Sequence, residues 1–101
     1  GMMERHYAPS RPLRINALKA RAGEALLGFG PQTPEDSTLN LSLTGDLVEA
    51  ASTLFSIILH LDRQNISGIA IMPIPSTGLG QAINDRLRRA ALGSTYNDNS
   101  R

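Results

Sequence analysis

The sequence predicts a single α/β domain with a small, mainly parallel sheet. Its second half carries the evidence. An amphipathic helical pattern, an unbroken apolar run typical of a strand buried on both faces, and a second helical pattern follow one another between residues 46 and 92. Short apolar runs in the first half offer further strands. This order of elements favours parallel pairing with right-handed crossovers.

Length and charge limit what this domain can be. A chain of 101 residues without cysteine is enough for one domain, and it contains no disulfide or thiolate metal site. The net charge of +1 argues against a domain whose main task is neutralising nucleic-acid phosphates. No apolar run approaches the roughly 18 residues of a membrane span, and the start lacks a secretion signal. We therefore expect a cytoplasmic protein without a membrane partner.

The first half of the chain is predicted to supply an arm and three short strands. Residues 1–11 are polar and contain proline, which indicates an extended arm. Residues 13–17 alternate between apolar and polar and fit a first strand. An apolar run at residues 25–29, bounded by glycines, fits a second strand, and residues 38–41 fit a third.

The first helix is expected to follow Asp46. Asp46 and Glu49 have capping-box spacing, and the positive end of a helix favours both carboxylates. The apolar side chains of residues 47–61 cover an arc of about 200°. This arc is wider than one sheet face needs, so the helix should contact a second neighbour. His60 lies on the polar side and is expected to face solvent.

A buried strand at residues 68–74 and a closing helix complete the predicted domain. The helix is expected to run from Gly78 to Leu92, with Ser76 or Thr77 as its cap and Gly93 as its stop. Residues 93–101 then form a flexible tail. The predicted inner face of the helix consists of Leu79, Ala82, Ile83, Arg86, Leu87 and Ala90.

The turn before this helix is the first candidate binding site. Thr77, Gly78 and Gly80 follow a buried strand and precede free helix amides, the place where open α/β sheets bind ligands. Gly78-x-Gly80 resembles the start of a dinucleotide fingerprint. However, Ile83 stands where the third glycine belongs, and the lysine of a phosphate-binding loop is missing. The two interpretations are an anion or phosphate site and a plain tight turn.

Arg86 is the second candidate, because a charge on an inner helix face needs a partner or a ligand. In one interpretation its stem covers apolar surface while the guanidinium pairs with a carboxylate or with carbonyls at a strand end. In the other it faces an anion bound at the turn, since helical side chains lean toward the amino end. Arg88 and Arg89 lie within reach of Asp85 and are expected to form a solvated edge.

The sequence offers no catalytic residue and no metal ligand set. Its two histidines are far apart and its carboxylates are not clustered, which argues against a metal site. Serines and threonines lie in caps and turns, so no pair of nucleophile and base emerges. In the arm, His6 and Tyr7 could stack on a base or donate to phosphates, or they could simply pack on a neighbouring surface.

Three blocks, in order along the chain up to about Leu92, resemble one family. The opening Gly-Met-Met-Glu-Arg-His-Tyr-Ala-Pro resembles P-G-M-x-x-x-H-Y-x-P, the linker motif of the longer threonylcarbamoyl-AMP synthases, the Sua-five branch related to YrdC and YciO. The other two blocks are similar to the carboxy-terminal domain of that branch, and they comprise Asn40-Leu41-Ser42 with Gly45-Asp46-Leu47, Glu49-Ala50-Ala51 and Leu54-Phe55, then Gly78-Leu79-Gly80-Gln81-Ala82-Ile83 with Asp85-Arg86-Leu87.

The resemblance implies a Rossmann-like, three-layer accessory domain at residues 12–92, with residues 1–11 as the linker to a YrdC-like catalytic domain outside this sequence. The family's full enzyme is a nucleotidyltransferase. It uses ATP, threonine, bicarbonate and Mg²⁺ to make threonylcarbamoyl-adenylate, which serves tRNA modification. His6, Tyr7 and Pro9 would help to close the nucleotide pocket. This chain alone is expected to hold no cofactor and to be inactive.

Two other functions remain open. A stand-alone nucleotide- or RNA-binding module would use the Gly78–Gly80 turn and Arg86. A purely structural dimerisation domain is the other, and a change of Leu59 or Ile57 to a charged residue, followed by light scattering, would test it.

Overall fold

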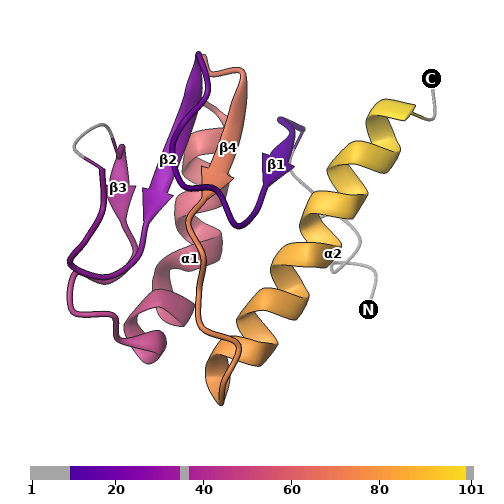
Figure 1. Cartoon of the computed structure of the whole chain (residues 1–101). Coiled ribbons are helices and arrows are strands. Elements are labelled where there is room, and N and C mark those ends of the chain that lie inside the picture. The colour runs from indigo at the N-terminus through magenta and orange to yellow at the C-terminus, as the bar shows by residue number, and fades with distance from the viewer. Residues whose placement is uncertain (1–9, 35–36, 100–101) are drawn as a thin grey trace.

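The computed structural model describes residues 10–34 and 37–99, with the side chains of residues 94–99 excepted. Six elements follow one another in this part of the chain: β1 (Leu13–Arg14), β2 (Glu24–Gly28), β3 (Leu39–Asn40), α1 (Leu47–Asp62), β4 (Gly68–Ile71) and α2 (Leu79–Asn99). The strands form one sheet in the order β1-β4-β2-β3 (Figure 1). Every pairing is parallel, so the predicted α/β class and the parallel sheet are confirmed.

β4 lies between β1 and β2 and is buried along its whole length, as its apolar run predicts. Ile69 pairs with Leu13 on one side and with Ala25 on the other. β1 is shorter than the predicted strand because Asn16 has a positive φ of 57°, which interrupts the extended backbone. The amide of Ala17 nevertheless donates to the Ile71 carbonyl at 2.9 Å, so this segment still follows β4.

The main core lies between the sheet and the two helices. Alternate strand residues point to this face, since successive side chains in a strand point to opposite sides. They pack against both helices in one cluster whose fully buried members are Leu13, Ala25, Leu27, Leu41, Ala50, Leu54, Ile58, Leu61, Ile69, Ile71, Ile74, Ile83 and Leu87. The helices also contact each other, which confirms that the wide apolar arc of α1 has a second neighbour.

The opposite face of the sheet carries a smaller cluster. Ala17, Leu26 and Ala70 are buried there, with Ala20 and Met72 packed against them. Ala17 and Ala20 belong to the connection between β1 and β2, residues 15–23, which is irregular in structure. The described residues therefore place both helices on one face and a loop on the other. The expected third layer is not helical, because nine residues are too few for a crossover helix.

α2 differs from its prediction at its end and in its buried face. It continues through Gly93 to Asn99, so the predicted stop is wrong. A glycine inside a helix costs only about 1 kcal/mol and does not end it unaided. The buried arc is rotated toward Gly80, Ile83, Asn84 and Leu87, while Leu79 is 42% exposed. The rotation follows from Gly80, where a Cβ would overlap the Pro75 carbonyl oxygen.

Candidate functional site

The carboxyl ends of the strands, at the bottom of Figure 1, are the place where the sequence predicts a ligand. At the start of α2, the Gly80 amide donates to the Thr77 carbonyl at 2.9 Å, and the Gln81 amide donates to the Gly78 carbonyl at 3.1 Å. Gly78 has a positive φ of 54°, which favours glycine. Both glycines therefore have structural reasons to be there. Anion binding by Thr77, Gly78 and Gly80 stays a prediction.

Asn84 ties this turn to α2. Its Nδ2 atom donates to the Ile74 carbonyl at 2.7 Å and to the Ser76 hydroxyl at 2.9 Å. The side chain is buried, so both bonds stabilise the strand end by more than exposed bonds would. Sequence reasoning missed Asn84, although a short amide one turn into a helix, after Pro-Ile-Pro, is a signal for such a bond.

Arg86 is exposed, so its predicted burial is wrong. Its guanidinium carbon lies 4.5 Å from the centre of the Phe55 ring on α1, which is cation–π geometry. The partner is therefore a ring rather than the predicted carboxylate or carbonyls. Arg86 is also separated from Leu79, at the turn, by about 10 Å along the helix axis. The structure thus gives Arg86 a role in fastening α2 to α1.

The loop between β3 and α1 holds the most connected polar group at this end. The Ser42 hydroxyl is buried, donates to Glu49 Oε1 at 2.7 Å and accepts from the Asp46 amide at 2.8 Å. The predicted cap is confirmed, because Asp46 Oδ1 accepts from the Val48 amide at 2.9 Å. Asn40 joins the group, accepting from the Ser42 amide and donating to the Gly30 carbonyl. These groups satisfy one another and hold the loop in place.

The opposite end of the sheet contains a site that sequence reasoning missed. The Asp62 carboxylate, at the end of α1, accepts three hydrogen bonds: from the Ser10 amide at 3.0 Å, the Ser10 hydroxyl at 2.9 Å and the Arg11 amide at 2.9 Å. The Arg11 guanidinium also donates to the Gln64 carbonyl at 3.1 Å. Burial alone would raise the pKa of Asp62, but the hydrogen bonds outweigh it and lower this pKa.

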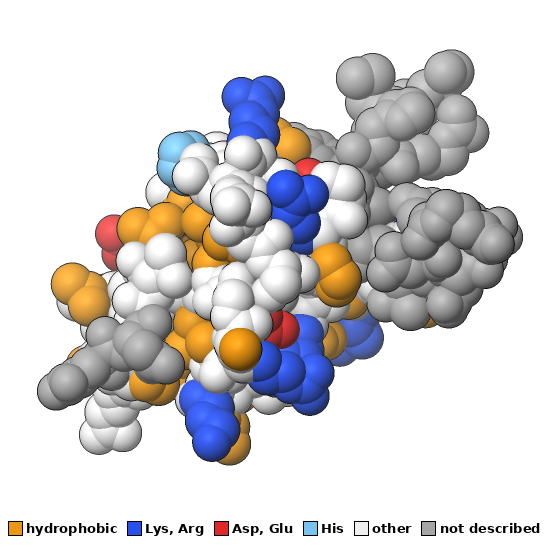
Figure 2. Space-filling view, turned by 90° about the horizontal axis from the view of Figure 1, so that it is seen from above, with side chains coloured by type: hydrophobic (Ala, Val, Ile, Leu, Met, Phe, Trp, Pro, Cys, Tyr) orange, Lys and Arg blue, Asp and Glu red, His pale blue; other side chains and the backbone are white. Residues whose placement is uncertain are grey.

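An ion pair on the face opposite the helices lies near this end. Arg14 and Glu24 make two bonds, Nη2 to Oε1 at 2.7 Å and Nε to Oε2 at 3.1 Å. They come from the two strands that flank β4, where Gly68 has no side chain. The hydrogen bond from Arg14 is the main reason that the pKa of Glu24 is lowered. Figure 2 looks down on this end and shows more Lys and Arg than Asp and Glu side chains.

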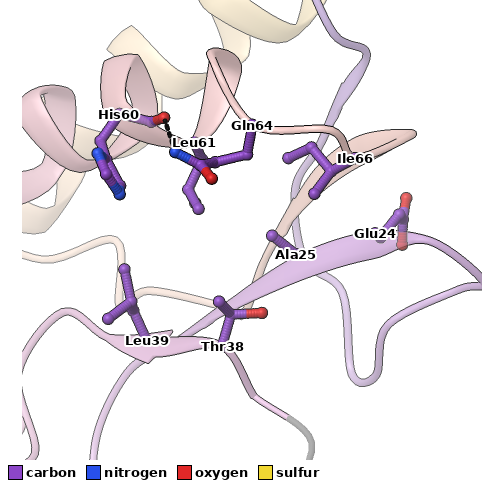
Figure 3. Close-up of a pocket in the computed structure, with 8 residues that line it drawn as sticks. All are labelled: Glu24, Ala25, Thr38, Leu39, His60, Leu61, Gln64 and Ile66. Carbon is purple, nitrogen blue, oxygen red and sulfur yellow. Dashed lines mark hydrogen bonds between the residues drawn. The ribbon is translucent and has the colours of Figure 1, made fainter.

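A groove of about 360 Å³ lies between the last turns of α1 and strands β2 and β3. His60 and Gln64 of α1 and its following turn face Thr38 and Leu39 across it (Figure 3). His60 is exposed, as predicted. Glu24, the one carboxylate among the described lining residues, is already paired with Arg14, so these described residues offer no free carboxylate for acid–base chemistry.

Four further predictions concern a metal site, a membrane span, the arm and the solvated edge of α2. Within the described residues, no three His, Cys, Asp or Glu side chains gather as a metal site. In the same part of the chain, neither helix is long and apolar enough to cross a membrane. His6, Tyr7 and Pro9 lie outside the described residues. The salt bridge from Asp85 to Arg89, at 3.0 Å, confirms the predicted solvated edge of α2.

Comparison with known proteins gives two matches. Residues 1–92 match the family described as the C-terminal domain of threonylcarbamoyl-AMP synthase. The chain is also 30% identical over 109 aligned residues to a protein of Pyrococcus abyssi named threonylcarbamoyl-AMP synthase. That alignment covers 90% of this chain and 31% of the Pyrococcus protein, so the chain spans about a third of that relative's length. No solved structure matches the chain significantly.

Proposed function

Because the chain belongs to the family of threonylcarbamoyl-AMP synthase C-terminal domains, we propose that it is an accessory domain that assists a YrdC-like catalytic domain. The observation that carries this proposal is the extent of the family match. It begins at residue 1 and so includes the arm with His6, Tyr7 and Pro9, as well as the α/β domain. Because the arm and the α/β domain match the family as one unit, we expect them to act together.

The polar groups of the domain support an accessory role. At the carboxyl end of the sheet, where α/β enzymes place their chemistry, Ser42, Glu49 and Asn84 bond to neighbours in the same loops. Groups that are satisfied in this way shape a loop, whereas a general base must be within reach of a substrate proton. We therefore assign no catalytic residue to the described part of the chain.

In this proposal the arm supplies the functional contribution. The complete synthase would use ATP, threonine, bicarbonate and Mg²⁺, would release pyrophosphate and would make threonylcarbamoyl-adenylate for tRNA modification in the cytoplasm. His6, Tyr7 and Pro9 would close over the nucleotide pocket of the catalytic domain. Closure of a pocket excludes water, which protects a reactive intermediate from hydrolysis, and it also fixes the reactants in position.

The test compares a YrdC-like catalytic domain alone with the same domain joined to this chain through residues 1–11. Pyrophosphate release that depends on threonine and bicarbonate is measured. We expect the joined protein to be more active, and we expect Tyr7→Ala to remove most of the gain, about tenfold or more, because closure then fails. Ser52→Ala is the control, since Ser52 is an exposed residue in the first half of α1, away from the amino end of the sheet. Equal activity with and without this chain would contradict the proposal.

The stand-alone binding module is tested with the same protein. The chain alone is titrated with ATP and, separately, with unmodified tRNA, in low salt and in about 0.2 M salt. The accessory role predicts no saturable binding of either ligand to the chain alone. Binding that is retained in salt and lost in Arg86→Met would favour the module instead, because it would assign Arg86 to a ligand rather than to Phe55.

A further inference from the structure

We propose that Asp62 is the positioning residue of the arm, and that the catalytic domain therefore meets this domain at the amino end of the sheet. The inference rests on the proposed function, because it assumes that the arm closes a pocket on another domain. It goes beyond that function in naming the residue that fixes the arm and the end of the fold where the partner lies.

The contacts of Asp62 single out the root of the arm. Both carboxylate oxygens are used: Oδ2 accepts from the Ser10 amide and hydroxyl, and Oδ1 accepts from the Arg11 amide. These donors come from residues more than 50 positions earlier in the sequence. Gln64, just beyond α1, adds a carbonyl that accepts from the Arg11 guanidinium. Two consecutive residues are thus held at four points, immediately after Pro9.

Asp62 lies at a position in its helix where an acid is unfavourable. It is the last residue of α1, where the helix dipole is negative and a carboxylate is unfavourable. Backbone amides and a hydroxyl that converge on the carboxylate compensate for this, and charge-assisted bonds are the stronger kind. A carboxylate at the carboxyl end of α1 does not stabilise the helix itself. The hydrogen bonds to Ser10 and Arg11 therefore best explain why an aspartate occupies this position.

Chain length then limits where the arm can act. Three Cα-to-Cα steps lead from Tyr7 to Ser10, and a fully extended chain covers at most about 3.6 Å per step. The Cα atom of Tyr7 thus stays within about 11 Å of the Cα atom of Ser10. The helix from Leu47 to Asp62 is about 22 Å long. The Gly78 turn lies at its far end, where the Leu47 side chain approaches Gly80.

The reach of the Tyr7 Cα atom from Ser10 is therefore only about half the length of α1, too short to bring it to the Gly78 turn. A pocket that Tyr7 closes must lie beside the end of α1 and the amino ends of the strands, the end viewed in Figure 2. This is the opposite end from the usual ligand position of an α/β sheet. The consequence is an interface with the catalytic domain formed around residues 10–12 and 60–66.

The first test measures hydrogen exchange of the Ser10 and Arg11 amides by NMR in this chain alone. Asp62→Asn keeps the shape of the side chain but replaces one of its two oxygens by an amide nitrogen. Only one oxygen is then left to accept from Ser10 and Arg11. We expect exchange at these amides to become at least about tenfold faster, with the rest of α1 unchanged. Asp85→Asn on α2 is the matched control and should change neither amide. Unchanged exchange in Asp62→Asn would overturn the proposal.

The second test uses the chain joined to a YrdC-like catalytic domain and measures kcat/KM for threonine. We expect Asp62→Asn to lower it about tenfold, and Asp62→Asn combined with Tyr7→Ala to be no worse than Tyr7→Ala alone. Such non-additivity shows that Asp62 acts through the arm, whereas a general loss of stability would lower the activity of both backgrounds. Ser10→Ala removes one bond without touching the core and should shift both readouts in the same direction.

The outcomes separate the two proposals. If Tyr7→Ala lowers activity while Asp62→Asn and Ser10→Ala do not, the arm closes the pocket but Asp62 does not position it, and this inference fails alone. Additive losses lead to the same conclusion. If Tyr7→Ala has no effect, the proposed function fails, and the positioning role fails with it.

Discussion

The two ends of the parallel sheet differ in what their polar side chains connect. At the carboxyl end, Ser42 bonds to Glu49, seven residues away, and Asn84 bonds to Ile74, ten residues away. At the amino end, Asp62 bonds to Ser10, which is 52 residues away. The first end stabilises its own loops, while the second joins the end of α1 to the segment just before β1. In the accessory role proposed above, the connection to a catalytic domain would therefore lie where α/β enzymes do not usually place ligands.

A substitution at Gly80 should have the largest effect on the carboxyl end of the sheet, because this residue packs tightly in the turn before α2. Gly80→Ala places a Cβ against the Pro75 carbonyl oxygen, so the turn or the helix must move. We expect the free energy of unfolding to fall by about 3 kcal/mol, as in overpacked cores. Urea denaturation followed by circular dichroism measures it. Gly93→Ala, on the same helix, is the control and should raise stability by about 0.5–1 kcal/mol. A neutral Gly80→Ala would mean that the turn is not tightly packed.

Ser42→Ala tests whether the loop of the carboxyl end is held by its own polar groups. It leaves the Asp46 amide and the Glu49 carboxylate without the hydroxyl that serves both. We expect a loss of about 1 kcal/mol in the free energy of unfolding, the usual contribution of a hydrogen bond, because Asp46 and Glu49 are exposed and water can replace the hydroxyl. Ser52→Ala on the exposed side of α1 should cost far less. Equal effects of the two variants would show that the Ser42 hydroxyl has no structural role.

A fall in pH should weaken the hydrogen bonds at the amino end of the sheet before it unfolds the core. The folded-state pKa values of Asp62 and Glu24 are lowered, so the unfolded chain binds protons more readily than the folded chain. Their contribution is complete above the ordinary carboxyl values of about 4, and it is lost as the pH falls through the lowered values. Amide exchange at Ser10 and Arg11, corrected for the intrinsic rate, should accelerate below about pH 4 before the core opens. If acid reduced amide protection throughout the chain at the same pH, the amino end of the sheet would not open separately from the core.

Arg86→Met should have the smallest effect. It keeps an apolar stem over Phe55 and removes the cation, which at exposed sites contributes about 0.5–1 kcal/mol. We expect a loss of this size in the unfolding free energy and unchanged activity of the joined enzyme. A large loss of activity with unchanged stability would return Arg86 to the role of an anion ligand.

Local signals in the sequence were enough to predict most of the framework. The cap at Asp46 depends on amides two and three residues away, and the buried strand β4 depends on its own apolar run. Both could therefore be derived from a short window. The extension of α2 through Gly93 could not, because one glycine weakens a helix without deciding where it ends.

Tertiary contacts account for what the sequence did not predict. The helical wheel of α2 placed Arg86 inside and did not consider Asn84, because the wheel cannot show that Gly80 must face Pro75. Asp62 was missed because its donors lie at the other end of the sequence. One signal for it was present, an acid in the last turn of a helix, where the dipole disfavours it.

The most direct measurement of the central claim is a hydrogen-exchange footprint of the chain joined to a YrdC-like catalytic domain, compared with the chain alone. We predict that residues 60–66 and the amides of Ser10 and Arg11 become at least about tenfold more protected, while residues 76–81 exchange as before. Protection confined to residues 76–81, with the root of the arm unchanged, would contradict the claim that the partner meets the amino end of the sheet.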